Sequence, residues 1–223
     1  MSARFCLLSS TSGAVVRRVW QEDRRFRDDL SLVITDRHCG AADFATENCI
    51  PHVMLQERDG LVFSNKLAAL LRECRIDYTF CFFTRLLRGS ICKEFGDRIF
   101  NFHPSLLPAN PGMHGFEDSV ASGALFIGST VHVVNELMDA GKIVMQSAVS
   151  SRATSGDLKA LRHQIYKQQC AQLLQVFLWA RAGRLSINAQ GVEVRGADYI
   201  GAELCVPAIE DDASRRLASG MSA

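Results

Sequence analysis

The 223-residue sequence lacks several features that large classes of protein require. No apolar run approaches the ~18 residues needed to span a bilayer, which argues against a membrane protein. Lys and Arg total 25 and Asp and Glu total 24, so a formal net charge of +1 provides no overall attraction to nucleic acid or anionic lipid. Hydrophobic residues at 48% and charged residues at 22% exclude a fully disordered chain.

The eight cysteines do not form a metal-binding or disulfide pattern. No two are spaced as CxxC, and no Cys/His cluster has zinc-ligand spacing, so we predict no metal site. Cys6 in FCLL and Cys81 in TFCFF lie in apolar runs, which is typical of buried thiols in a reduced compartment. Residues 1–8 are too short for a secretory signal. We therefore expect a cytoplasmic protein.

Strand-like and helix-like segments alternate through the first half of the sequence. The expected strands are 5–9, 30–36, 52–56, 78–83 and 98–102, and the expected helices are 13–21, 41–48 and 61–75. This alternation predicts an α/β fold, a Rossmann-like and mostly parallel sheet flanked by helices. Ligands of such folds bind beyond the carboxyl ends of the strands, so the loops after Ser9, Phe83 and Phe102 are the candidate site.

The pattern changes after residue 103. Residues 104–111 contain three of the five prolines and cannot form a regular element. The elements expected further on are a helix at 114–122, strands at 127–136 and 142–150, a long C-terminal helix from Asp157 to Trp179, and a hairpin at 184–195. We find no internal repeat or linker. We expect one catalytic domain over residues 1–209, followed by a polar, flexible tail over 210–223.

Chemically useful side chains concentrate at the end of the fifth expected strand. Strand alternation puts Asn101 and His103 on one face, where they offer an amide donor and a group that titrates near neutral pH. Leu107-Pro108 is a candidate cis peptide. A structural histidine at a strand end is the simpler interpretation. Asp139, in a turn between two strands, could reach back and orient His103, but sequence spacing alone leaves that contact open.

Three segments carry a resemblance to a known family. NFHPSLLP at 101–108, STVHVV at 129–134 and MDAGKIVMQ at 138–146 resemble the folate-dependent formyltransferase superfamily, most closely its glycinamide ribonucleotide formyltransferase branch. The resemblance covers roughly residues 4–185. It implies that Asn101, His103 and Asp139 are catalytic. It also implies 10-formyltetrahydrofolate as co-substrate and a small-molecule amine as acceptor.

The reaction that the resemblance implies is physically reasonable. An amine attacks the formyl carbonyl, and Asn101 with a protonated His103 stabilises the oxyanion. Asp139 keeps His103 charged and helps to relay the amine proton. The pterin ring of the folate is implied to bind mainly to backbone groups of two loops. The residues implied for it are Arg85, Leu86, Leu87, Val134, Asn135 and Glu136.

Two departures from the branch fall on the acceptor side. The branch has a Gly-Asn-Gly-Ser-Asn turn after its first strand, whose N–H groups bind the substrate phosphate, where this chain has Ser-Thr-Ser-Gly at 10–13. A Glu-His pair of its long C-terminal helix is replaced by Gln169-Cys170. The residues implied for acceptor binding are Ser10, Thr11, Ser12, Gly13, Thr84 and Gln169.

These departures favour an altered acceptor, an amine or hydroxylamine other than the purine intermediate, such as hydroxyornithine in siderophore synthesis. Glycinamide ribonucleotide remains an alternative. A formyltetrahydrofolate deformylase would use a similar trio with water, although the N-terminal regulatory domain usual in those enzymes is not expected here. A folate-binding protein without turnover is disfavoured by the intact trio. We expect no nucleic-acid or membrane partner, and a monomer or homodimer.

Overall fold

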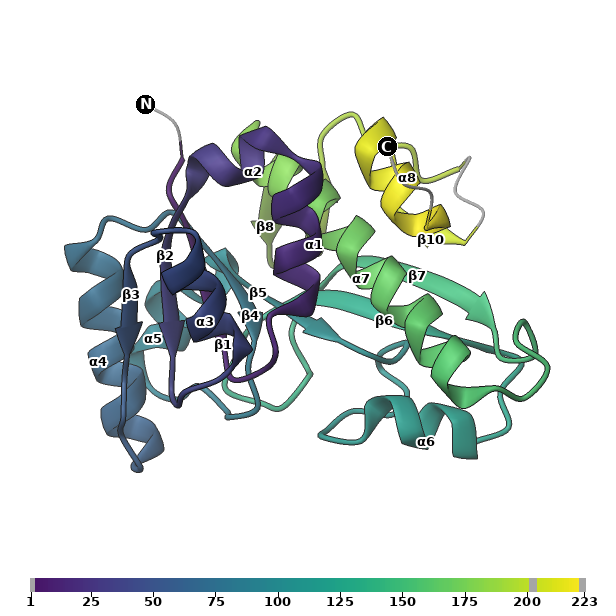
Figure 1. The fold of residues 1–223 in the computed structure, drawn as a ribbon, viewed down its shortest axis with the longest axis horizontal. Helices are drawn as coiled ribbons and strands as arrows, with labels where there is room; N and C mark the ends of the chain where they lie inside the picture. The colour runs from purple at the N-terminus through teal and green to yellow at the C-terminus, as the bar shows by residue number, and fades with distance from the viewer. Residues whose placement is uncertain (1–2, 201–203, 221–223) are drawn as a thin grey trace. The chain divides into compact units, whose positions relative to one another are not determined.

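A computed structural model describes residues 3–200 and 204–220 (Figure 1). The chain divides into two compact units. The first comprises residues up to 101 together with 133–141, and the second comprises 102–132 together with the described residues from 142 onward.

The first unit is built on parallel strands. In it, β4 pairs with both β5 and β1, β1 with β2, and β2 with β3, all in parallel. Its strands are β1 (Phe5–Ser9), β2 (Leu30–Thr35), β3 (His52–Met54), β4 (Tyr78–Phe82) and β5 (Ile99–His103), the last of which continues into the second unit. Its helices are α1 (Ala14–Glu22), α2 (Arg24–Asp29), α3 (Gly40–Glu47), α4 (Gly60–Glu73), α5 (Ser90–Glu94) and the 3-10 helix η1 (Gly96–Arg98).

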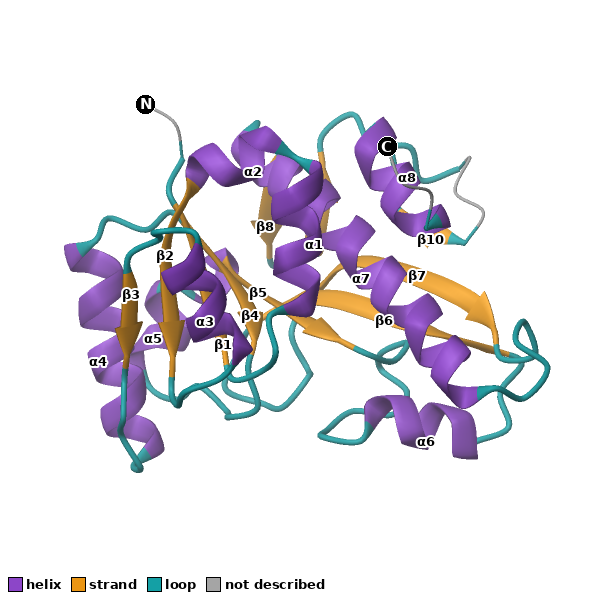
Figure 2. Ribbon diagram, in the orientation of Figure 1, coloured by secondary structure: helices purple, strands orange, loops and turns teal. Residues whose placement is uncertain are grey.

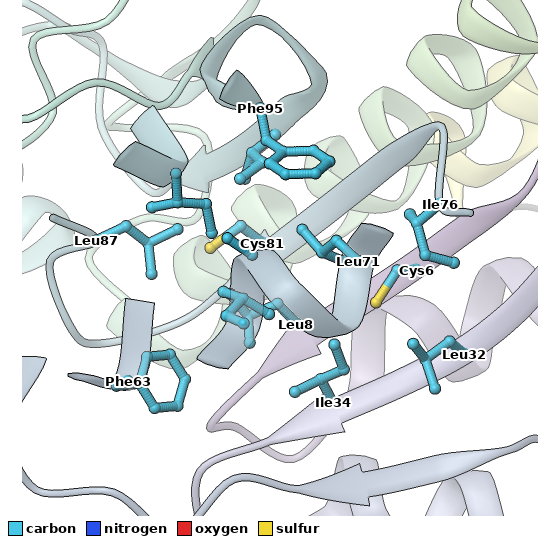
Figure 3. Packing of buried hydrophobic residues seen from close by; sticks show 14 residues of the cluster. Cys6, Leu8, Leu32, Ile34, Phe63, Leu71, Ile76, Cys81, Leu87 and Phe95 are labelled. Carbon is cyan, nitrogen blue, oxygen red and sulfur yellow. The ribbon is translucent and has the colours of Figure 1, made fainter. Parts of the chain in front are cut away.

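Helices cover both faces of these strands, as buried parallel strands require. On one face, side chains of β1 and β2 pack with the buried side of α4 and with α5 in a cluster that includes Leu8, Ile34 and Leu71 (Figure 3). On the other face, Phe26 of α2 packs against Phe80 of β4 with ring centroids 6.1 Å apart. Alternate side chains of each strand thus enter two separate layers.

The second unit is antiparallel. In it β6 (Phe126–Val133) pairs with β7 (Ile143–Ser150), and β7 also pairs with the short β10 (Cys205–Val206). The long helix α7 (Leu158–Arg181) lies along β6 and β7 (Figure 2), and the side-chain amide of Gln172 fixes it there by donating to the Ser129 carbonyl and to Ser147 Oγ, both at 3.0 Å. The remaining elements are α6 (Gly115–Ala121), the hairpin of β8 (Leu185–Asn188) and β9 (Gly191–Val194), and α8 (Asp212–Ser219).

The predicted fold class is confirmed: a mostly parallel mixed sheet flanked by helices, followed by a long C-terminal helix and a hairpin. The predicted cis peptide at Leu107-Pro108 is also present. Among the described residues, no helix is both long and apolar enough to cross a bilayer. The division into a domain over 1–209 and a tail stays a prediction.

Polar composition predicts a flexible tail from residue 210, and the described part of that segment contains a helix, which was not predicted. The Asp211 carboxylate caps α8 by accepting from the Ser214 N–H, and Ala213 and Leu217 are buried one turn apart. The N–H of Glu210 donates to Gln175 Oε1 of α7 at 2.9 Å. Two apolar side chains at helical spacing therefore anchor a segment that is polar on average. Residues 221–223 lie outside the described part of the chain.

We expect Leu67→Ala to lower the free energy of unfolding by about 2–5 kcal/mol, because Leu67 is fully buried between α4 and the strands. Val62→Ala on the same helix should change it by less than about 0.5 kcal/mol, because Val62 is 42% exposed. Urea unfolding followed by circular dichroism measures both. Equal losses in the two variants would contradict the assignment of the buried face of α4.

Candidate functional site

The candidate site begins at the carboxyl end of β5, where two polar residues interrupt an apolar strand. Asn101 and His103 are separated by the buried Phe102. Asn101 pairs in register with Cys81 of β4. The short strand therefore carries an amide and, two residues on, an imidazole.

The loop after β6 brings a carboxylate to Asn101 within the first unit. Asn101 Nδ2 donates to Asp139 Oδ1 over 3.5 Å, a long hydrogen bond. These residues are 38 apart in the sequence, so the contact depends on the path of residues 134–141. The predicted proximity of Asp139 to the end of β5 is found at Asn101, whereas the predicted pairing of Asp139 with His103 stays a prediction.

Backbone and side-chain contacts shape this loop. The Val134 N–H donates to the Ile99 carbonyl of β5 at 3.0 Å, which ties the start of the loop to that strand. The Asn135 amide accepts from the Leu137 N–H and donates to the Ala140 carbonyl, both at 3.0 Å. Asp139 itself has φ 52°, a left-handed conformation that Asp tolerates better than most residues. Closing the loop on itself therefore holds Asp139 in a conformation that most side chains disfavour.

Cys81 lies beside this carboxylate in the core of the first unit. The pKa of the Cys81 thiol is raised to about 12, mainly by burial and in smaller part by the charge of Asp139. Its side chain packs with Leu8 and Leu87 (Figure 3). The thiol is therefore neutral near pH 7 and is not a candidate nucleophile.

The second unit holds His103 and the proline-rich segment after it. His103 is only 4% exposed, and its Nε2 lies 2.9 Å from the Asn110 carbonyl oxygen. Ser129 Oγ of β6 donates to the His103 carbonyl at 3.2 Å. Main chain and ring of His103 are thus both held by hydrogen bonds.

A single hydroxyl organises the turn at 105–108. Thr130 Oγ1 donates to the Ser105 carbonyl at 2.7 Å and accepts from the Leu107 N–H at 3.0 Å. The side-chain amide of Gln146 donates to Thr130 Oγ1 at 3.0 Å and to the Leu107 carbonyl at 2.7 Å. This support was not predicted from the sequence, although the polar pair Ser129-Thr130 within β6 is a signal for it.

The loop after β1 meets the loop after β4. Ser10 Oγ and Thr84 Oγ1 share a hydrogen bond of 3.0 Å, and the Thr84 N–H donates to Ser10 Oγ at 3.1 Å. The Thr11 carbonyl accepts from the Ala41 N–H at 3.2 Å. Gly13, the residue immediately before α1, has φ 70°, and no side chain caps that helix. The structure therefore brings together two of the predicted acceptor-binding residues, Ser10 and Thr84.

The remaining predicted site residues have varied surroundings. The Arg85 guanidinium donates to the carbonyls of Glu57 and Arg58 and lies 4.6 Å from the centroid of the Phe63 ring, so it is committed to the protein. Leu86 is half-buried, Leu87 is buried in the core cluster and Glu136 is exposed. Ser12 is exposed and Gln169 on α7 is half-buried.

No metal centre is indicated: across residues 3–200 and 204–220, no three His, Cys, Asp or Glu side chains are grouped to hold an ion. The chemistry available at the site comes from an amide donor, a carboxylate and an imidazole.

Comparison with known proteins gives consistent matches. A family model described as Formyl transferase matches residues 4–177. The phosphoribosylglycinamide formyltransferase of Mycobacterium tuberculosis is 31% identical over 180 residues, which is 77% of this chain and 81% of that protein. The chloroplastic phosphoribosylglycinamide formyltransferase of Arabidopsis thaliana is 32% identical over 160 residues, 66% of this chain and 54% of that one, so the match spans about half of the plant protein. The crystal structure of glycinamide ribonucleotide transformylase 1 from Symbiobacterium toebii has a TM-score of 0.78 and 28% identity, covering 86% of this chain and 94% of that one.

We expect Cys81 and Cys6 to resist iodoacetamide at pH 8 in the folded protein, because burial raises the pKa of both thiols. At a pKa of about 12, only about one Cys81 thiol in ten thousand is ionised at pH 8. The exposed Cys49 should be labelled first. Peptide mass spectrometry gives the order, and labelling in denaturant is the control, in which all eight cysteines should react. Labelling of Cys81 as fast as Cys49 in the folded protein would contradict this.

Proposed function

The chain belongs to the formyl transferase family, and we propose that it moves the formyl group of 10-formyltetrahydrofolate to an amine, with glycinamide ribonucleotide as the favoured acceptor. The family match bears out the resemblance seen in the three sequence segments. The family assignment supports the co-substrate, and the printed names of the relatives support the acceptor.

The hydrogen bond between Asn101 and Asp139 is the observation that carries the proposal. We propose that these two residues act with His103, which follows Asn101 two residues later in β5, as the family motif implies.

Formation of the new C–N bond places negative charge on the formyl oxygen. In the proposed mechanism, the Asn101 amide and an imidazolium at His103 donate hydrogen bonds to that oxygen. Each such donor is worth about 3 kcal/mol in the transition state. The Asp139 carboxylate favours the charged imidazole and receives the proton that the amine loses, through water. The bond from the formyl carbon to N10 then breaks, and N10 takes up a proton as tetrahydrofolate leaves.

The pterin ring is proposed to bind to the backbone of residues 85–87 and 134–136. The surroundings of the side chains favour backbone contacts, because Arg85 is bonded to residues 57 and 58 and Leu87 is in the core. The side chain of Asn135 closes the 135–140 loop, which favours a fixed set of backbone groups there. Pre-formed backbone donors and acceptors bind a flat heterocycle at low entropic cost.

Glycinamide ribonucleotide is favoured because relatives that match most of this chain carry that name. We propose that Ser10, Thr11, Ser12, Gly13, Thr84 and Gln169 bind the acceptor. The N-terminus of α1 after Gly13 offers N–H groups of the kind that bind phosphate.

A second acceptor class has specific support. In the 10–13 loop, Ser10 is hydrogen-bonded to Thr84, and the glycines of the branch turn are missing. Both features reduce the number of backbone N–H groups that a phosphate could contact. Cys170, at the place of a branch histidine, is 1% exposed. Both features are compatible with an amine or hydroxylamine without a phosphate, such as hydroxyornithine.

We expect His103→Ala, Asp139→Ala and Asn101→Ala each to lower kcat by roughly 10²–10⁴-fold, because each removes a group that stabilises developing charge or moves a proton. Tetrahydrofolate release measures the rate, and circular dichroism checks the fold. Asp97→Ala is a matched control, since Asp97 is an exposed aspartate of the same unit. Wild-type kcat in either His103→Ala or Asp139→Ala would refute the catalytic assignment.

We expect glycinamide ribonucleotide to give the highest kcat/KM in a panel of amines that includes N5-hydroxyornithine and amino sugars. The donor alone should raise the thermal midpoint, because a ligand that binds only the folded state stabilises it. A clear preference for an amine without a phosphate would refute glycinamide ribonucleotide as the acceptor and support the second acceptor class. Tetrahydrofolate release without any amine would indicate a hydrolase, and a midpoint shift without turnover would indicate a binding protein.

A further inference from the structure

One edge of the His103 ring contacts the segment that follows it. Nε2 lies 2.9 Å from the Asn110 carbonyl oxygen, which can only accept a hydrogen bond. Nε2 therefore carries the hydrogen of this contact. At 4% exposure, the residue has little water available as a replacement partner.

Gly115, the first residue of α6, lies against the same edge. A Cβ built on Gly115 would lie 2.5 Å from His103 Nε2, 2.9 Å from Cε1 and 3.2 Å from the Asn110 carbonyl oxygen. The missing side chain thus provides the space that the ring occupies. We call the Asn110 carbonyl and Gly115 together the Asn110–Gly115 seat.

Hydrogen bonds from two buried serine hydroxyls hold the seat in place. Ser105 Oγ donates to the Asn110 carbonyl at 2.9 Å, so that oxygen has a second donor. The Asn110 side-chain amide donates to Ser119 Oγ at 3.2 Å, and Ser119 Oγ donates to the Gly115 carbonyl at 2.6 Å. Asn110 has φ 51°, a conformation in which Asn is among the best-tolerated residues. One asparagine therefore presents its carbonyl to the ring and locks the turn through its side chain.

We propose that Asn110, Gly115 and Ser119 are positioning residues, which hold the His103 ring in one orientation with its hydrogen on Nε2. In the neutral ring Nδ1 is then the acceptor nitrogen. The preference for the Nε2–H form stands on the seat alone. The effect of the seat on formyl transfer rests on the proposed function.

A two-bond ¹H–¹⁵N correlation spectrum distinguishes the tautomers directly. In the neutral His103 ring we expect the Nε2–H pattern, with the signal identified among the six histidines by its loss in His103→Gln. Gly115→Ala should push the ring off the carbonyl and give a mixture of tautomers. Ser119→Ala should do so partially, and Ser119→Thr should restore the native pattern.

The same variants are assayed for formyl transfer with the best acceptor. Gly115→Ala should lower kcat roughly 10–100-fold with KM for donor and acceptor unchanged, because the ring is displaced while the binding loops are not. Ser122→Ala is the matched control, since it removes a hydroxyl from the end of the same helix, bonded to the Ser119 carbonyl and away from His103. It should keep kcat within about twofold and leave the spectrum unchanged.

An Nδ1–H pattern in the active wild-type enzyme would overturn the inference. It would also be overturned if Gly115→Ala changed neither the spectrum nor kcat. An Nε2–H pattern in a protein that formylates no amine would support the seat and refute the proposed function, so the two failures are distinguishable.

Discussion

The tie between β5 and the loop after β6 is the contact on which the first unit's part of the site depends. The Val134 N–H bonds to the Ile99 carbonyl, and further along Asn101 bonds to Asp139. A hydrogen bond to a charged group contributes roughly 1.5–3 kcal/mol, and at 3.5 Å this one lies at the weak end. Its importance is geometric, because it fixes where the carboxylate of a loop stands relative to a strand. The proposed formyl transfer needs the Asp139 carboxylate to stand at this position beside β5.

Much of the architecture was predictable because it follows from local patterns. Alternating apolar runs located β1 to β5, and spaced apolar residues after Asp157 located α7. The short helices α2 and α8 were missed since each depends on one or two buried side chains, Phe26 in α2 and Ala213 and Leu217 in α8. Charged residues dominate α2, and polar and charged residues together dominate α8, so the average composition of each segment resembles a loop.

The site was predictable to the extent that a motif encodes it. Asn101, His103 and Asp139 stand in segments that resemble a known family, and the contact of Asn101 with Asp139 was found in the structure. Asn110, Gly115 and Ser119 were not predicted, because their roles depend on a turn with left-handed backbone and on space left by an absent side chain. Such features leave no periodic pattern in the sequence from which they could be predicted. The core position of the Leu87 side chain likewise depends on tertiary packing rather than on its neighbours in sequence.

Thr130 limits how this chain can vary. It occupies a fully buried position in β6, between Ser129 and Val131, where the β-branched valine would have the same shape. Yet its oxygen serves the Ser105 carbonyl, the Leu107 N–H and the Gln146 amide at once. Exchanging hydroxyl for methyl would leave two buried backbone groups and the half-buried Gln146 amide without that partner, so a more hydrophobic side chain at this position would destabilise the turn.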